Sequence, residues 1–347
     1  MTVVHELGHA VGLKHPFESS GISTTRLPSS LDSRSYTIMS YSAQPGAKDT
    51  FFSYEPTSLM TLDIAAIQHI YGANYEYNSG NDIYQYSDET PYHQTIWDGG
   101  GTDTIQYDGN RESIIDLQQE HGSRIGQAVY IEGATSQVQQ TVENIWIARD
   151  VDIENASGGK NNDQLIGNKL GNYLQGHAGN DNITGGGGND TINGGAGLDT
   201  THYSLAYENY TIIPDEEGYK IQANAGTDGV DIIREVERIV FADTKLALDI
   251  NGHAGEVSKI LGAVFGSDAV ADKQLAGIGL QRLDSSTSST ELTQQALNAK
   301  LGSGFSDQAE IQLLYQNILS TQPSQDELNY WSNTLNNGQF TQTSLAV

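Results

Sequence analysis

The sequence contains no cysteine, and it has few prolines and few basic residues. Its 347 residues include 7 prolines and 17 Lys and Arg together, against 44 Asp and Glu together. The absence of cysteine excludes disulfide bonds, thiolate metal sites and a cysteine nucleophile. The sequence also lacks a run of about 18 consecutive apolar residues, so we expect no membrane-spanning helix.

The shortage of basic residues gives the chain a formal net charge of -27 and a mean hydropathy of -0.44. A phosphate backbone would repel such a chain, so nucleic acid is excluded as a partner. An excess of carboxylates instead suits divalent cations, because calcium prefers oxygen ligands. Glycine is abundant, with 38 residues. The length of the chain predicts two or three domains.

A histidine motif lies near the first residue. Residues 5–15 read H-E-L-G-H-A-V-G-L-K-H, which has the form H-E-x-x-H-x-x-G-x-x-H. His5 and His9 are four residues apart on a helix that we expect to reach Lys14, so they project from one face and can bind one metal ion. Gly12 permits a turn that brings His15 to the same ion. Three protein ligands with one open position are typical of a catalytic zinc site.

Two further stretches accompany this motif. Glu6 lies between the two helical histidines, where a carboxylate can take a proton from water. Tyr36–Tyr41 reads Y-T-I-M-S-Y and places Met39 as in the Met-turn of metzincins. Leu62–Asn74 reads L-D-I-A-A-I-Q-H-I-Y-G-A-N. These stretches argue against the alternative for a bare H-E-x-x-H, which is a helix with two surface histidines. Together the motif and both stretches resemble the serralysin family of secreted bacterial zinc proteases.

The resemblance, which extends from Met1 to about Thr201, implies an endopeptidase that hydrolyses peptide bonds of extracellular proteins. Glu6 would act as general base, and Tyr41 would be an extra zinc ligand that swings away and stabilises the oxyanion. Met39 would lie beneath the metal, and His69 would be structural. Leu62–Asn74 would form the helix that closes the catalytic domain. The zinc ligands would be His5, His9 and His15.

The resemblance also implies a secreted, extracellular and monomeric protein that leaves the cell through a type I secretion apparatus. In metzincins a twisted sheet precedes the zinc helix and covers it. The chain begins where the second half of such a domain would begin, so we expect a fragment without that sheet. The zinc helix is apolar on most of its surface, and includes Val3, Leu7 and Val11, so we expect it to be buried on several sides.

A nine-residue repeat of the form G-G-x-G-x-D-x-U-x begins at Gly158. In such a turn, carbonyl and carboxylate oxygens face calcium, and the last three residues form a strand. Each unit buries one side chain, so metal binding must supply the free energy of folding. A flexible glycine-rich linker, the alternative, gives no reason for acidic and aliphatic residues to recur in phase. The acidic positions are Asp163, Asn172, Asp181, Asp190 and Asp199, and Asn172 is expected to weaken one site.

The resemblance implies one more calcium site ahead of the repeats. Its ligands would come from two facing loops, with Asn78 and Asp82 acting through their backbone carbonyls. Glu154, just before the first repeat, is a plausible further ligand. The complete set for this site is Asn78, Gly80, Asp82, Asp98, Gly100 and Asp103.

These observations predict an α+β remnant of a metzincin catalytic domain, an all-β parallel β-roll that forms a calcium-binding solenoid, and an α-helical C-terminal region. The catalytic remnant would span residues 1–74. The roll would span 75–202, with the calcium repeats at 158–202. Antiparallel strands at 203–250 would cap it, and a helical domain of unknown function would follow at 251–347.

Two functions follow from this sequence. The favoured one is a secreted zinc endopeptidase of the serralysin type, stabilised by calcium. The alternative is a catalytically inactive fragment that acts as a calcium-dependent exported binding or surface module. The intact histidine motif favours the protease, whereas the large portion without catalytic motifs favours the module.

Overall fold

The computed structural model describes residues 2–19, 24–47, 49–133 and 140–347. They form two compact units, Met1–Leu246 and Ala247–Val347, each with buried hydrophobic clusters of its own. Within the described ranges, no helix combines the length and the hydropathy that crossing a membrane requires.

Helix α1 (Thr2–Ala10) opens the first unit and ends before the predicted Lys14. Gly12 closes it with a φ of +100°. The Gly12 amide donates to the His9 carbonyl at 3.0 Å, and the Leu13 amide donates to the Gly8 carbonyl at 2.9 Å. This pair of bonds is the Schellman arrangement, which favours glycine because its left-handed conformation strains other residues.

The expectation that α1 is buried on several sides is wrong for the described chain. His5 and Gly8 are the buried residues of this helix. Val3 is 73% exposed and Leu7 is 59% exposed. The neighbouring segments therefore cover only the face of α1 that carries the histidines.

The segment after α1 contains a short helix η1 (Ser29–Leu31), strand β1 (Thr50–Phe52) and helix α2 (Thr61–Tyr71). Strand β1 pairs antiparallel with β7 (Val129–Gly133), which pairs with β8 (Gln140–Val142). Residues near the N-terminus thus share a sheet with residues about 80 positions later. A second small sheet joins β3 (Gln94–Ile96), β9 (Ile145–Ile147) and β6 (Gly122–Ser123).

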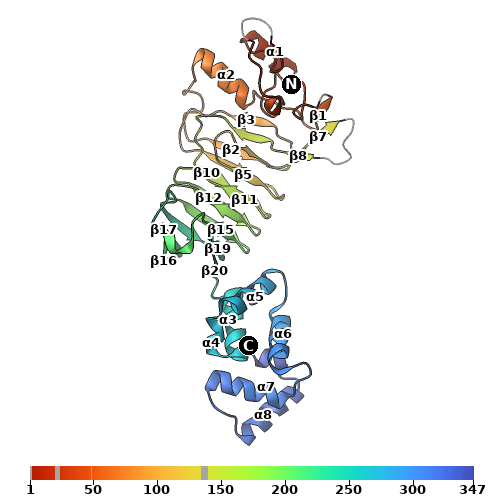
Figure 1. The fold of residues 1–347 in the computed structure, drawn as a ribbon, viewed down its shortest axis with the longest axis vertical. Coiled ribbons are helices and arrows are strands. Elements are labelled where there is room, and N and C mark those ends of the chain that lie inside the picture. The colour runs from red at the N-terminus through yellow and green to blue at the C-terminus, as the bar shows by residue number, and fades with distance from the viewer. Residues whose placement is uncertain (1, 20–23, 48, 134–139) are drawn as a thin grey trace. The chain divides into compact units, whose positions relative to one another are not determined.

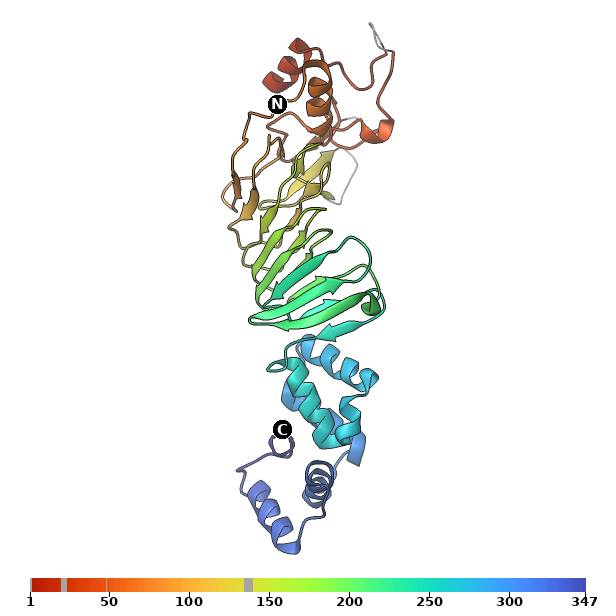
Figure 2. The ribbon, with the colours of Figure 1, turned by 90° about the vertical axis from the view of Figure 1, so that its left-hand side faces the viewer.

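Two larger sheets make up the rest of the first unit (Figures 1 and 2). The strands of the first are β2 (Ile83–Tyr86), β4 (Thr104–Tyr107), β10 (Asn155–Ser157), β12 (Tyr173–Ala178), β14 (Thr191–Ala196), β16 (Tyr210–Asp215), β17 (Gly218–Ala223) and β18 (Val230–Arg234). The strands of the second are β5 (Ile114–Asp116), β11 (Gln164–Ile166), β13 (Asn182–Thr184), β15 (Thr200–His202), β19 (Arg238–Val240) and β20 (Lys245–Ala247). Successive strands along the repeats alternate between the two sheets.

Most neighbours in these sheets are parallel, and the repeats set their register. Leu174 of β12 lies beside Ile192 of β14, and Leu165 of β11 lies beside Ile183 of β13. All four of these side chains are 0% exposed. The apolar position of each repeat therefore faces the interior, as the sequence pattern predicts.

The expectation of antiparallel strands over residues 203–250 holds only in part. A short helix, η2 (Tyr207–Asn209), precedes β16. Strands β16 and β17 are antiparallel. Strand β18 is instead parallel to β14, and β19 is parallel to β15. The two parallel sheets thus continue beyond the last nine-residue repeat.

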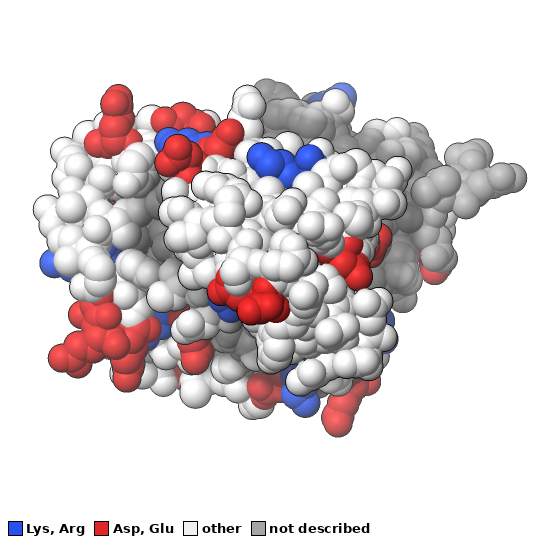
Figure 3. Space-filling view, turned by 90° about the horizontal axis from the view of Figure 1, so that it is seen from below, with Lys and Arg blue, Asp and Glu red and all other residues white. Residues whose placement is uncertain are grey.

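The second unit is helical. Its elements are α3 (His253–Phe265), α4 (Ser267–Val270), α5 (Lys273–Asp284), α6 (Ser289–Leu301), α7 (Asp307–Leu314), the π-helical turn η3 (Tyr315–Leu319), α8 (Gln325–Asn336) and α9 (Gln342–Leu345). Asp272 separates α4 from α5, and its side chain caps α5. Aliphatic residues such as Val264 and Leu297 form its core. On the face seen in Figure 3, uncharged residues predominate and acidic residues lie in separate groups.

Candidate metal centres

The three motif histidines meet at one point. The His15 Nε2 atom lies 3.2 Å from the Nε2 atom of His9 and 3.3 Å from that of His5. Helix α1 supplies His5 and His9, and the turn at Gly12 supplies His15. The spacing of the sequence motif therefore corresponds to a group of three side chains that could hold a metal ion.

The other ring nitrogen of each histidine has an oxygen partner. The His5 Nδ1 atom lies 2.8 Å from the Ile38 carbonyl, and the His9 Nδ1 atom lies 2.9 Å from the Leu13 carbonyl. The third partner is the Glu18 carboxylate, 2.7 Å from the Nδ1 atom of His15. These oxygens accept hydrogen bonds, so each Nδ1 must carry the proton and each Nε2 must present a lone pair.

The three Nε2 lone pairs face one another, and none of the three rings offers a donor to the others. Such an arrangement suits a cation, and oxygen partners on the distal nitrogens are the usual support of histidine metal ligands. The hydrogen bond with His15 also lowers the pKa of Glu18 below its ordinary value. An ionised Glu18 favours a protonated Nδ1 on His15. The donor set thus fits zinc, which accepts nitrogen ligands in tetrahedral sites.

The two predicted catalytic side chains flank this triad differently. The Tyr41 hydroxyl lies 2.8 Å from the His15 Nε2 atom, and its ring stacks on that of His5 at 5.8 Å between centroids. Glu6 is exposed on α1, one position after His5. His69, on α2, is exposed and is not part of the triad.

Met39 lies against the histidine helix. It is 1% exposed, and a Cβ atom added at Gly8 would lie 2.6 Å from its sulfur atom. A larger residue at position 8 would push Met39 away from the helix. Gly8 is a site residue that sequence reasoning missed, although its place between the motif histidines was a usable signal.

A buried aspartate of α2 supports the segment that carries Met39. Asp63 is 2% exposed and accepts hydrogen bonds from the Thr37 hydroxyl at 2.5 Å and the Ile38 amide at 2.8 Å. The Met60 amide donates to it at 3.0 Å. Burial raises the pKa of Asp63 despite these donors. Because the Ile38 carbonyl contacts His5, Asp63 supports the triad through the backbone of a single residue, Ile38.

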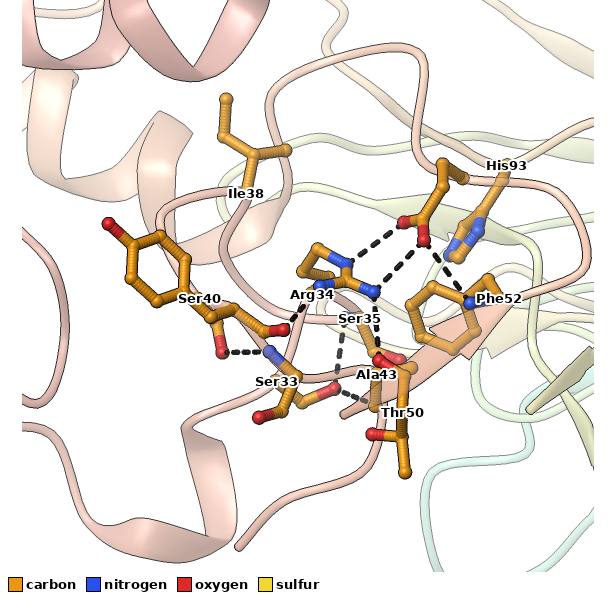
Figure 4. A network of polar contacts seen from close by, with 12 residues as sticks. Ser33, Arg34, Ser35, Ile38, Ser40, Ala43, Thr50, Phe52 and His93 are labelled. Carbon is orange, nitrogen blue, oxygen red and sulfur yellow. Dashed lines mark hydrogen bonds and ion pairs between the residues drawn. The ribbon is translucent and has the colours of Figure 1, made fainter. Parts of the chain in front are cut away.

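The second support is a network around Arg34 (Figure 4). Arg34 is 3% exposed, and its guanidinium makes two hydrogen bonds of 2.9 Å to the Glu55 carboxylate. The same group donates to the carbonyls of Tyr41 and Thr50 at 2.6 and 3.1 Å. Arg34 thus joins the Tyr41 segment to strand β1.

The loops before the repeats form an acidic cluster. The carboxylates of Asp82, Asp98 and Asp103 approach within 4.8 Å of one another. The second oxygen of Asp103 is buried and has no hydrogen-bond partner among the described residues. Burial, with Asp98 and Glu154 nearby, raises the pKa of Asp103 to about 6. A divalent cation fits this site, because it would replace the missing donors.

The remaining predicted ligands of this site lie in the same two loops. Asn78 has a φ of +46° and donates from its side chain to the Tyr84 hydroxyl at 3.1 Å. The Gly80 carbonyl packs against Gly101, and the Gly100 amide donates to Asp98 at 2.7 Å. Asp82, which was expected to act through its backbone, also brings its side chain to the cluster.

The acidic positions of the repeats form ladders with a step of 18 residues. The Asp163 amide donates to Asp181 at 2.7 Å, and the Asp181 amide donates to Asp199 at 2.8 Å. On the other side, the Asn172 amide donates to Asp190 at 2.8 Å. Glu154 accepts from the Asp103 amide at 2.8 Å. One oxygen of each of these accepting carboxylates therefore accepts a hydrogen bond from a backbone amide.

The other oxygen of three repeat aspartates is buried without a partner. The atoms concerned are the second carboxylate oxygens of Asp181, Asp190 and Asp199, and no described residue donates to them. Burial raises the pKa of Asp181 to about 6 and those of Asp190 and Asp199 to about 7. Burying a carboxylate oxygen without a hydrogen-bond donor costs free energy. A hard cation that binds the oxygen would offset this cost.

Glycine at the first repeat position leaves room for these oxygens. A Cβ atom added at Gly176 or Gly185 would collide with the unpartnered oxygen of Asp181 or Asp190. The collision at Gly176 would also include the carbonyl of Gly194. A carboxylate oxygen and a carbonyl from the next turn thus converge on one small space, as a calcium site requires.

Residues after the repeats extend both ladders. The sequence of Gly226–Ile233 resembles one more degenerate Gly/Asp turn, but the contacts of Asp231 and Glu237 in the ladders were not predicted. The Asp190 amide donates to Asp231 at 2.9 Å, and the Asp199 amide donates to Glu237 at 2.8 Å. The Glu235 carbonyl lies beside Gly194 in the place that glycine carbonyls occupy in earlier turns. The Gly/Asp-rich stretch at 226–231 was the available signal.

Comparison with known proteins identifies the family. The model of the serralysin C-terminal region of M10 peptidases matches residues 61–263, more than half of the chain. The model of a domain of unknown function, DUF4214, matches residues 288–347.

Three relatives illustrate the similarity. The metalloprotease AprA of Pseudomonas entomophila is 35% identical over 195 residues, which are 50% of this chain and 38% of that protein. Serralysin of Photorhabdus luminescens is 37% identical over 193 residues, 50% of this chain and 37% of that protein. Serralysin B of Dickeya chrysanthemi is 38% identical over 180 residues, 47% and 35% of the two chains. The match thus spans little more than a third of each relative. With the family model covering more than half of its residues, the chain belongs to the serralysin family and contains its C-terminal region.

Proposed function

We propose that this chain is part of a secreted zinc endopeptidase of the serralysin type, whose repeats bind calcium. The observation that carries the proposal is the triad of His5, His9 and His15. Their Nε2 lone pairs face one another, and each Nδ1 has an oxygen acceptor. This donor set leaves a place for a cation. Three converging imidazoles have no other evident use.

The residues around the triad have separate roles in peptide hydrolysis. When bound, zinc would polarise the scissile carbonyl and lower the pKa of water. Glu6 takes the proton of the attacking water as general base and passes it to the leaving amine. The Tyr41 hydroxyl, next to His15, donates a hydrogen bond to the oxyanion. The contact between Met39 and Gly8 fixes the position of the helix that carries His5 and His9.

Calcium has a structural role in the proposal. Each of the repeats buries one side chain at its apolar position, which cannot offset the backbone entropy of nine residues. The buried oxygens of Asp181, Asp190 and Asp199 support cation binding as the source of the remaining folding free energy. Asp163, Glu154 and the cluster around Asp103 belong to the same set. Folding would then follow export to a medium rich in calcium, with a type I apparatus as the route and a monomer as the product.

Zinc content and proteolysis test the catalytic part. We expect the full chain, refolded with calcium, to bind one zinc ion per chain and to cleave casein. Glu6→Gln should abolish cleavage and retain zinc, because the carboxylate is the base and not a ligand. Glu76→Gln, an exposed glutamate, is the matched control and should change neither property.

The outcomes distinguish the two candidate functions. Zinc binding without cleavage by the unmodified chain would favour the alternative, a calcium-dependent binding module. The exposure of Val3 and Leu7, on the face of α1 opposite the histidines, is the specific observation behind that alternative, because no described segment packs on that face. Loss of zinc from Glu6→Gln would contradict the role given to Glu6.

A further inference from the structure

The Tyr41 side chain reaches the triad, but it is not packed into the protein core. It is 57% exposed, and its ring contacts are with His5, His15 and Phe17 at centroid distances of 5.8, 4.7 and 5.2 Å. Tyrosine rings in cores are held by packing on several sides. An exposed ring depends instead on its own backbone for direction, so whatever fixes the Tyr41 backbone also directs its hydroxyl.

Arg34 holds that backbone at two consecutive peptide units. Its guanidinium donates to the Tyr41 carbonyl at 2.6 Å. Its backbone amide donates to the Ser42 carbonyl at 2.9 Å. The Ser42 amide also donates to the Ser40 hydroxyl at 3.3 Å. The planes of the peptides that follow Tyr41 and Ser42 are therefore both tied to one residue.

Glu55 fixes Arg34 in turn. The two hydrogen bonds of 2.9 Å between them form a bidentate pair, which allows one orientation of the guanidinium. The Arg34 side chain is 3% exposed and that of Glu55 is 30% exposed. A lysine could keep the charge at position 34, but it could not present the planar fork that bonds Glu55 and the Tyr41 carbonyl together.

We propose that Arg34, oriented by Glu55, is a positioning residue that directs the Tyr41 hydroxyl toward the metal triad. Arg34 itself contacts no triad histidine and no reacting atom. The inference rests on the proposed function, because it assigns Arg34 a role only if the triad holds a metal. It adds two residues outside the zinc motif to those on which catalysis depends.

Copper(II) in place of zinc gives a readout specific to Tyr41. A phenolate bound to copper(II) produces a charge-transfer absorption band in the visible region, whereas imidazoles do not produce that band. The refolded full chain should show the band when loaded with one equivalent of copper(II), and Tyr41→Phe should lack it. Arg34→Lys and Glu55→Gln should bind copper with unchanged affinity and lose most of the band. In protease assays they should lower kcat roughly tenfold, as changes behind a metal ligand often do, with little change in KM.

Two comparisons make the test decisive. Arg111→Lys changes a more exposed arginine that pairs with Asp88, and it should leave the band intact. A merely structural role for Arg34 would lower copper affinity and band together, and that result, or a full band in both Arg34→Lys and Glu55→Gln, would overturn the inference. Failure of the proposed function looks different, because the unmodified chain itself would then bind no copper at the triad.

Discussion

At the scale of single residues, buried carboxyl groups fall into two classes. Asp63 is buried with three donors. Glu310 on helix α7 is 0% exposed, and neither of its oxygens has a hydrogen-bond partner among the described residues. Burial, and to a lesser extent Asp307, raises the pKa of Glu310 to about 8. Asp63 therefore supports local structure, whereas ionised Glu310 opposes it.

The helical unit should consequently lose stability as the pH rises from about 4.5 to about 8. A carboxyl whose pKa is raised in the folded state stabilises it below the unfolded pKa, and this contribution disappears as the pH rises through the folded value. Glu310→Met removes the buried charge at similar volume. We expect it to stabilise the unit by roughly 1–4 kcal/mol at pH 9, with a smaller effect at pH 6, measured by urea unfolding.

An exposed glutamate on α6 provides the control for that experiment. Glu291→Met should leave the pH dependence as it is, since Glu291 is exposed. If Glu310→Met were equally destabilising at both pH values, the carboxyl would have a favourable role in packing, and the explanation by a buried charge would be wrong.

The triad residues were predictable from the sequence, but their surroundings were not. One helix and the turn after it bring His5, His9 and His15 together, so a local pattern suffices. The exposure of Val3 and Leu7 depends on which segments pack on α1, and an apolar helix does not specify its neighbours. Arg34 and Glu55, 21 residues apart, meet only because the chain between them folds back.

At the scale of elements, the repeat spacing predicted the parallel strands and their inward residues. It did not predict that β18 and β19 continue the sheets. The hairpin of β16 and β17 interrupts the period, so that Asp231 and Glu237 lie 41 and 38 residues from their ladder partners instead of 18. A search for a nine-residue period ends at such an interruption, although the backbone pairing resumes after it.

Calcium should invert the pH dependence of these sheets. Without calcium, Asp181, Asp190 and Asp199 have pKa values of about 6 to 7, against an ordinary value of 3.8. The chelated protein should therefore be most stable below about pH 4 and lose stability as the pH rises to about 7. With millimolar calcium the ion replaces the proton, and stability should rise over the same range.

Urea titrations followed by the strand signal in circular dichroism measure this effect. Gly176→Ala, in which the new methyl group would occupy the space beside Asp181, should remove most of the difference between the calcium and chelated samples. A chelated protein whose midpoint rises steadily from pH 4 to pH 7 would contradict the assignment of raised pKa values.

At the scale of the whole molecule, the two units should respond separately to calcium. The candidate calcium ligands lie in Met1–Leu246, whereas the described core of Ala247–Val347 is aliphatic. Calorimetry of the full chain should show two unfolding transitions. A chelator should move one of them by many degrees and leave the other, detected by the helix signal, nearly unchanged. A single transition that shifts as one would contradict this independence.

The ladders of acidic residues also give the molecule a direction. In each step an earlier amide donates to a later carboxylate, from Asp163 to Asp181 and from Asp181 to Asp199. Loss of a turn from the early end removes a donor and leaves a carboxylate with one more free lone pair. Loss of a turn from the late end leaves a buried amide with no acceptor, which is costly. The two ends of the stack therefore differ in the group that a detached turn leaves without a partner, which is a carboxylate at the early end and a backbone amide at the late end.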